Sequence, residues 1–143
     1  MPIIGFNFTK INVERKEGAA GKVSIKNNVT IKDVEETNLA FGKEKQNALK
    51  ILFEFASKYE PKIGSILIEG NLMFMGESKK VKEILNGWSK DKKIPKDAMS
   101  AILNNILTRC NIQALILSQD VNLPPPIPLP KVQADATDKG YIG

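Results

Sequence analysis

Residues 48–74 read ALKILFEFASKYEPKIGSILIEGNLMF, and the first half of this stretch is the clearest strand signal in the chain. Apolar side chains recur there at every second position, the period of a β-strand; they are Leu49, Ile51, Phe53 and Phe55. Pro61 interrupts the pattern within EPKIG, a connection of hairpin length. A further strand runs from about Ile63 to Met75. The stretch therefore predicts a β-hairpin.

The second strand of this hairpin carries apolar residues on both faces. Ile66, Ile68, Leu72 and Phe74 point one way, and Leu67, Met73 and Met75 point the other, with Glu69 and Asn71 between them. An antiparallel sheet with one face in water shows polar residues along that face. We therefore expect something to cover part of the second face. The candidates are a subunit interface at Met73 and Met75, or a ligand groove.

Two further strands are expected upstream of the hairpin. Residues 2–15 alternate with a change of phase at Thr9–Lys10, which indicates a bulge. EGAAG at 17–21 is a turn signal. Residues 23–34 form the next strand, with a candidate irregularity at Asn27–Asn28. Residues 35–46, EETNLAFGKEKQ, then predict a polar crossover that contains Leu39, Ala40 and Phe41.

Helices are expected downstream of the hairpin. Ser78 is a candidate cap for a short helix that carries Val81, Ile84, Leu85 and Trp88 on one face. Pro95 suits the first turn of a second helix, which extends to about Ser118 and would be roughly 36 Å long. Its apolar stripe includes Met99, Ile102, Ile106, Cys110, Ala114 and Leu117. The prediction is an α+β fold in which this helix covers one face of a four-stranded antiparallel sheet.

Composition narrows the function. The 143 residues suggest one domain, and 42% apolar with 26% charged residues is ordinary for a globular protein. The chain has no histidine, which removes the commonest general base and zinc ligand, and its one cysteine, Cys110, lies in the apolar helical pattern. No apolar run approaches the length of a membrane span. We expect a cytoplasmic protein that is not an enzyme and holds no metal or other cofactor.

Three patterns could carry chemistry or recognition. Glu54 and Glu69 lie on adjacent hairpin strands, which admits a carboxylate dyad. A structural or solvent-facing role is favoured, because no partner base or pocket is visible. The net charge of +5 admits a nucleic-acid-binding module, although the lysines are scattered among glutamates. Pro125–Pro128 matches the PxxP pattern of docking peptides, but the leucines and isoleucine around it favour packing on the domain itself.

Residues 121–132, VNLPPPIPLPKV, follow the long helix and hold five of the eight prolines. Together with the order of the elements, this segment resembles the SecB family of export chaperones. The matching parts are the first strand FNFTKINVERK, the hairpin ALKILFEFASKYEPKIGSILIEGNLMF, the long helix, and Leu123–Pro124–Pro125 followed by Ile127, Leu129 and Pro130. The resemblance spans about residues 3–132, so we expect one domain over 1–132 and a short polar tail over 133–143.

The resemblance implies a function. SecB-like proteins are homo-oligomers, tetramers built as dimers of dimers, and they hold unfolded polypeptides in hydrophobic grooves without nucleotide or metal. By matched region, the resemblance makes Leu39, Phe41, Leu123 and Ile127 groove residues, and Phe53, Phe55 and Phe74 possible contributors for which core packing is favoured. The chain is basic where bacterial export chaperones are acidic, so the SecA motor is not an expected partner. The expected partners are unfolded polypeptides or a dedicated protein client.

Overall fold

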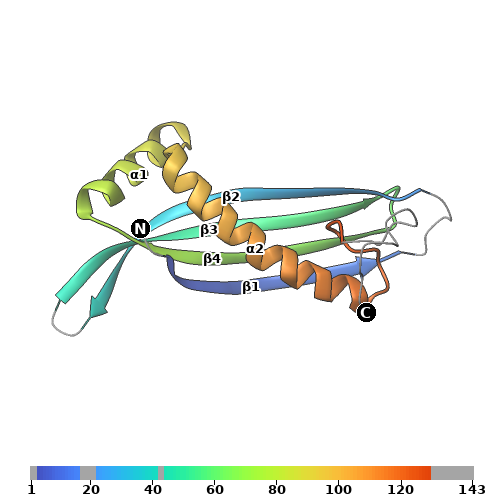
Figure 1. The fold of residues 1–143 in the computed structure, drawn as a ribbon. Helices are drawn as coiled ribbons and strands as arrows, with labels where there is room; N and C mark the ends of the chain where they lie inside the picture. Colours follow the sequence, from blue (N-terminus) through green and yellow to red (C-terminus); the bar gives the residue numbers. More distant parts are fainter. Residues whose placement is uncertain (1–2, 17–21, 42–43, 130–143) are drawn as a thin grey trace, which may run out of the picture.

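The computed structural model of this chain describes residues 3–16, 22–41 and 44–129, with the backbone alone at 39–41 and 44–46. The elements are β1 (Ile3–Arg15), β2 (Ser24–Phe41), β3 (Glu44–Glu60), β4 (Gly64–Met75), α1 (Ser78–Asp91) and α2 (Lys96–Asp120). The strands form a four-stranded antiparallel sheet in the order β1-β4-β3-β2. Figure 1 shows α2 lying diagonally across one face, with α1 at one end. The predicted α+β architecture is confirmed.

The core lies between α2 and one face of the sheet. Alternate side chains of β3 and β4 point toward this face. On β4, Ile66, Ile68 and Leu72 are fully buried and Phe74 is 1% exposed. Their neighbours on β3 are in the same phase, since Ile51 pairs with Leu72 and Phe55 with Ile68. The predicted stripe of α2 covers this face, with Ile102, Ile106, Cys110 and Ala114 fully buried. Burial raises the pKa of the Cys110 thiol to about 12, so this cysteine is a protonated core residue.

Both helices begin differently from the prediction. Ser78 was expected to cap α1, but the N-cap is Glu77, which makes no side-chain capping hydrogen bond. The Ser78 hydroxyl instead accepts a hydrogen bond from Asn47 Nδ2 at 2.9 Å, which takes it away from the helix N–H groups. Pro95 is the N-cap of α2 and lies just before its first turn. The sequence placed the helices correctly and their first residues wrongly.

The irregularities in the sheet were predicted in part. The bulge expected at Thr9–Lys10 is confirmed, because the pairing of β1 with β4 shifts between Phe8 and Lys10. Asn27–Asn28 was the wrong place for an irregularity in β2, since both residues pair regularly with β3. The shift in β2 lies between Ile31 and Asp33 instead. The turn signal at 17–21 falls outside the described residues.

The predicted crossover at 35–46 is wrong. The strand β2 continues to Phe41 and β3 begins at Glu44, so the two strands form a direct hairpin. The pairing of β3 with β4 reaches only to Ala48, which leaves the end of the hairpin as an arm that projects beyond the rest of the sheet (Figure 1). The two strands of this arm pair with each other there and need no apolar face against α2, so polar residues are mixed with Leu39, Ala40 and Phe41.

Gly70 sets the spacing at the centre of the sheet. A Cβ atom at this position would collide with the carbonyl oxygen of Asn7 on β1 and would lie 2.8 Å from Cζ of Phe53 on β3. The rings of Phe6 and Phe53 pack together beside it, with centroids 5.2 Å apart. The absent side chain thus makes room for an aromatic pair that joins the two strands flanking β4.

We expect Gly70→Ala to lower the free energy of unfolding by about 1–3 kcal/mol, because the added methyl group overpacks the aromatic pair. Chemical denaturation measures the loss. Gly5→Ala is the matched control, since a Cβ there meets only the flexible side chain of Met73, at 3.3 Å. Equal losses in the two variants would contradict this account of the packing around Gly70.

Candidate functional site

Residues 122–129, called the strap from here on, cross the helix-covered face of the sheet near the ends of the strands. Asn122 turns the chain away from α2 with a φ of 56°, a left-handed conformation that asparagine tolerates. The N–H of Leu123 donates to the carbonyl of Ser118 at 2.8 Å. The Leu123 side chain is 5% exposed and packs over Gly64 of β4, where a Cβ atom would come within 3.1 Å of it. From this anchor the strap runs over β3 and then β2.

Three polar side chains hold the strap where it crosses these two strands. The hydroxyl of Tyr59 on β3 donates to the carbonyl of Pro124 at 2.6 Å. On β2, Nδ2 of Asn27 donates to the carbonyl of Pro126 at 2.8 Å. The hydroxyl of Ser57 donates to Oδ1 of the same amide at 2.6 Å, which turns the amide nitrogen toward the strap. Asn27, Ser57 and Tyr59 are called the polar cluster below.

An open groove lies between the strap and β2. Its volume is about 520 Å³, and its lining is Ile25, Asn27, Pro125, Pro126, Ile127, Pro128 and Leu129. The lining is apolar except for the Asn27 amide and the carbonyls of the chain. A small number of fixed polar groups in an apolar hollow is the usual composition of a binding site.

A row of half-buried apolar residues leads from this groove along the edge of the sheet. It consists of Ile25, Val29 and Ile31 on β2, in the phase that faces α2. Arg109 of α2 lies 5.1 Å over the ring of Phe6 on β1, so the opposite side of the helix, which carries the half-buried Leu107, faces β2. Because β2 is the last strand of the sheet, its outer edge is unpaired within the described part of the chain. The row therefore combines apolar side chains with free backbone groups.

The residues predicted for a polypeptide site fall in different places. Ile127 lines the groove, and Leu123 is the buried anchor of the strap. Phe53, Phe55 and Phe74 are at most 1% exposed and belong to the core, so they do not face the groove in this conformation. Leu39 and Phe41 lie in the β2 arm, paired with Gln46 and Glu44, and their side chains are outside the description. Their contact with a client stays a prediction.

The opposite face of the sheet is uncovered by the described residues. Met73 and Met75 lie there, half-buried, as their phase in the sequence required. A shallow cavity of about 520 Å³ near the other end of this face is lined in part by Asn12, Asn28, Thr30 and Leu67. This face therefore mixes apolar and polar side chains.

Glu54 and Glu69 are directly paired on this uncovered face. Glu54 forms an ion pair with Lys32, with Nζ and Oε2 2.7 Å apart, and that hydrogen bond raises the pKa of Lys32. Within the described residues, no group of three or more acidic or cysteine side chains could hold a metal ion. Glu54 is therefore neutralised by a lysine, and the structural or solvent-facing role that the sequence favoured for the pair stays a prediction.

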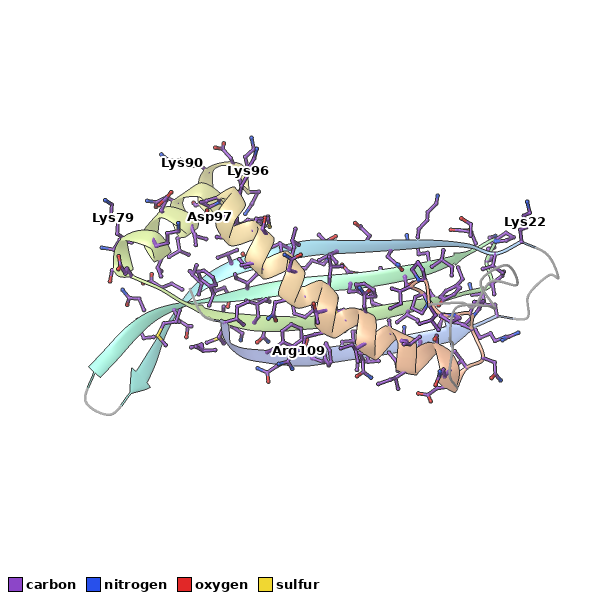
Figure 2. The ribbon with its side chains drawn as sticks, viewed as in Figure 1. Lys22, Lys79, Lys90, Lys96, Asp97 and Arg109 are labelled. Carbon is purple, nitrogen blue, oxygen red and sulfur yellow. The ribbon has the colours of Figure 1, made fainter. Side chains whose placement is uncertain are left out.

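Basic side chains lie at both ends of the sheet (Figure 2). Figure 2 shows Lys22 at one end of the sheet and Lys79, Lys90 and Lys96 around the helices at the other. No helix in the described ranges is long and apolar enough to cross a bilayer.

Comparison with known proteins gives a structural relationship alone. No family profile and no curated protein sequence matches the chain. Among solved structures, the SecB-like chaperone of Mycobacterium tuberculosis, in complex with a ChAD peptide from an antitoxin, superposes with a TM-score of 0.53, covering 92% of this chain and 89% of that one. The chain has a SecB-like fold. The sequence identity of 9% is too low to carry over residue roles.

The polar cluster was missed in the sequence, although it left a signal. Ser57 and Tyr59 continue the phase of Phe53 and Phe55, and Asn27 lies in phase with Val29. A serine in a buried phase is unusual unless it has a hydrogen-bonding partner, because burying an unpaired hydroxyl is unfavourable. Such residues could have been predicted to face polar groups of another segment. The partner segment, about 100 residues away for Asn27, could not.

Burial raises the pKa of Tyr59 from 10.0 to about 12. Because the unfolded chain ionises first, the contribution of Tyr59 to stability is complete below pH 10 and is lost as the pH rises toward 12. We expect ultraviolet titration of the folded protein to show a tyrosine that ionises near pH 12 and is absent from Tyr59→Phe. Titration of all tyrosine near pH 10 in the folded protein would contradict this.

Proposed function

We propose that this protein holds extended, apolar segments of unfolded or partner polypeptides, and that it does so without nucleotide, metal or chemical reaction. The site is the groove beside the strap together with the apolar row Ile25, Val29 and Ile31 on β2. The observation that carries the proposal is the position of this row on the free edge of the sheet. We place the protein in the cytoplasm, where its single cysteine stays reduced.

The edge of β2 offers two kinds of contact to an extended chain. Its unpaired backbone groups accept a peptide as an added strand, and its apolar side chains bind every second residue of that peptide. Ile127 of the strap adds an apolar wall at one end of the row. The SecB-like fold supports the same reading, because the mycobacterial SecB-like chaperone is a protein in complex with a peptide.

The proposal includes self-assembly. Met73 and Met75 lie on the uncovered face, and Ile4 and Ile11 of β1 are 38% and 43% exposed at the other edge of the sheet. Apolar groups gathered on an uncovered face and edge favour contact with another protein surface. A dimer or tetramer that buries the methionines would provide it.

Client holding is tested with Ile25→Lys in the full chain, because Ile25 of β2 lines the groove and belongs to the apolar row. Loss of an apolar contact of this size is worth about 1.5–3 kcal/mol, so we expect the affinity for an unfolded client to fall by about tenfold or more. Suppression of client aggregation by light scattering is the measurement. The matched control is Ile112→Lys, on an isoleucine of α2 that is 58% exposed and lies outside the groove. A wild-type protein that never suppresses aggregation would sink the proposal.

Assembly is tested with Met73→Lys. We expect this variant to shift toward the monomer, since a lysine on the contact face adds a charge to an apolar interface, while the unfolding midpoint of the monomer stays nearly unchanged. Size-exclusion chromatography with light scattering measures the mass. Ser100→Lys, at an exposed position of α2, is the control. A strictly monomeric wild-type protein would refute the interface.

A further inference from the structure

The strap is itself an extended apolar segment bound to the surface of the sheet. Beyond Leu123, residues 124–126 are prolines and lack an N–H group, so they cannot join a strand ladder. They are held through their carbonyl oxygens, by Tyr59 and Asn27, and through the buried ring of Pro126. These hydrogen bonds are made to main-chain carbonyl oxygens, which every polypeptide possesses.

The two donors are positioned by the strands that carry them. Tyr59 is 1% exposed with the strap in place, and the hydroxyl of Ser57, on the neighbouring strand, holds the Asn27 amide with its nitrogen outward. The strands align them, because Ser57 pairs with Asn27 and Tyr59 with Ile25. They therefore present two donors to carbonyls that are two residues apart in a bound chain. Donors arranged in advance bind without the entropy loss of ordering them.

The site also disfavours extended polypeptides whose residues carry N–H groups. The partners that the polar cluster offers to the strap are donors, so a bound residue with its own N–H group facing the sheet would leave that group unpaired. Proline avoids this because it has no N–H, and its fixed φ reduces the entropy lost on binding. The chemistry of the site thus fits extended segments rich in proline and aliphatic residues.

We propose that Asn27 and Tyr59, with Ser57 positioning the amide, form a carbonyl-binding site that the strap fills as an intramolecular ligand, and that proline-rich apolar segments of clients compete with the strap for it. The proposal rests on the proposed function, since it names a class of client. The far end of the strap is its exposed part: Pro128 and Leu129 are exposed, whereas Leu123 and Pro126 are buried. Displacement can therefore begin there while the anchor stays in place.

The test uses a fluorescent peptide with the sequence of residues 122–129, NLPPPIPL, and the full-length protein. Pro126→Gly weakens the strap and leaves the side chains of Asn27, Ser57 and Tyr59 unchanged. We expect this variant to bind the peptide about tenfold more tightly than the wild type, because the apparent dissociation constant varies inversely with the fraction of molecules whose site is open. Binding that is no tighter than in the wild type would make the strap a fixed wall and overturn the proposal.

A second substitution locates the binding. Asn27→Asp, added to Pro126→Gly, replaces the donor with a carboxylate that repels a carbonyl, so peptide binding should return to the wild-type level or below. Asn28→Asp makes the same change one residue along β2 on the opposite face and should have no effect. Equal effects of the two aspartates would overturn the proposal. Circular dichroism and protection of Cys110 from thiol reagents confirm that each variant is folded.

Two further comparisons separate the site from the proposed function. A peptide with alanines at the three consecutive prolines should bind Pro126→Gly several-fold more weakly than NLPPPIPL, since it brings unpaired N–H groups; equal binding would refute the preference for proline. Suppression of client aggregation is measured on the same proteins. If the wild type suppresses aggregation and Pro126→Gly does so no better, competition by the strap is refuted and client holding stands. If neither suppresses it, the proposed function fails.

Discussion

The unbroken alternation along β3 is the constraint on which both the fold and the site depend. Leu49, Ile51, Phe53 and Phe55 point toward α2 and bury the middle of the sheet. The same phase continues beyond the helix to Ser57 and Tyr59, which are buried under the strap. Because side chains on a strand alternate with a period of two, one register fixes the core and the polar cluster together. A shift by one residue would expose the phenylalanines and turn Tyr59 away from Pro124.

This constraint explains why one part of the fold could be predicted from the sequence and another could not. The core strands and α2 have strong periodic patterns because each must bury one face. The arm formed by the ends of β2 and β3 has no such requirement, and its polar residues looked like a crossover. The shift between Ile31 and Asp33 left no phase change as clear as the one at Thr9–Lys10. Sequence patterns report burial, and they fail where pairing alone holds the chain.

The candidate site likewise has one part that could be predicted from the sequence and another that could not. Leu123 and Ile127 were predicted as groove residues from the resemblance of residues 121–132 to the SecB family. The contacts that seat them join residues about 100 positions apart, such as Asn27 with Pro126 and Arg15 with Asn122. No local pattern encodes such pairs. Phe53, Phe55 and Phe74 could not be assigned from the sequence for a different reason. An aromatic residue at strand spacing fits a core and a binding surface equally well, and only the position of α2 decides between them.

The prolines of the strap also prevent N–H groups from being buried without acceptors, which would affect any segment in this position. A chain that crosses strands at the end of a sheet cannot pair with them in a ladder, so each of its N–H groups facing the sheet would be buried without an acceptor. Consecutive prolines at 124–126 remove those groups, and the carbonyls that remain find Tyr59 and Asn27. The strap can thus lie on the sheet without extending it. The outer edge of β2 therefore stays unpaired within the described residues, although the strap lies beside it.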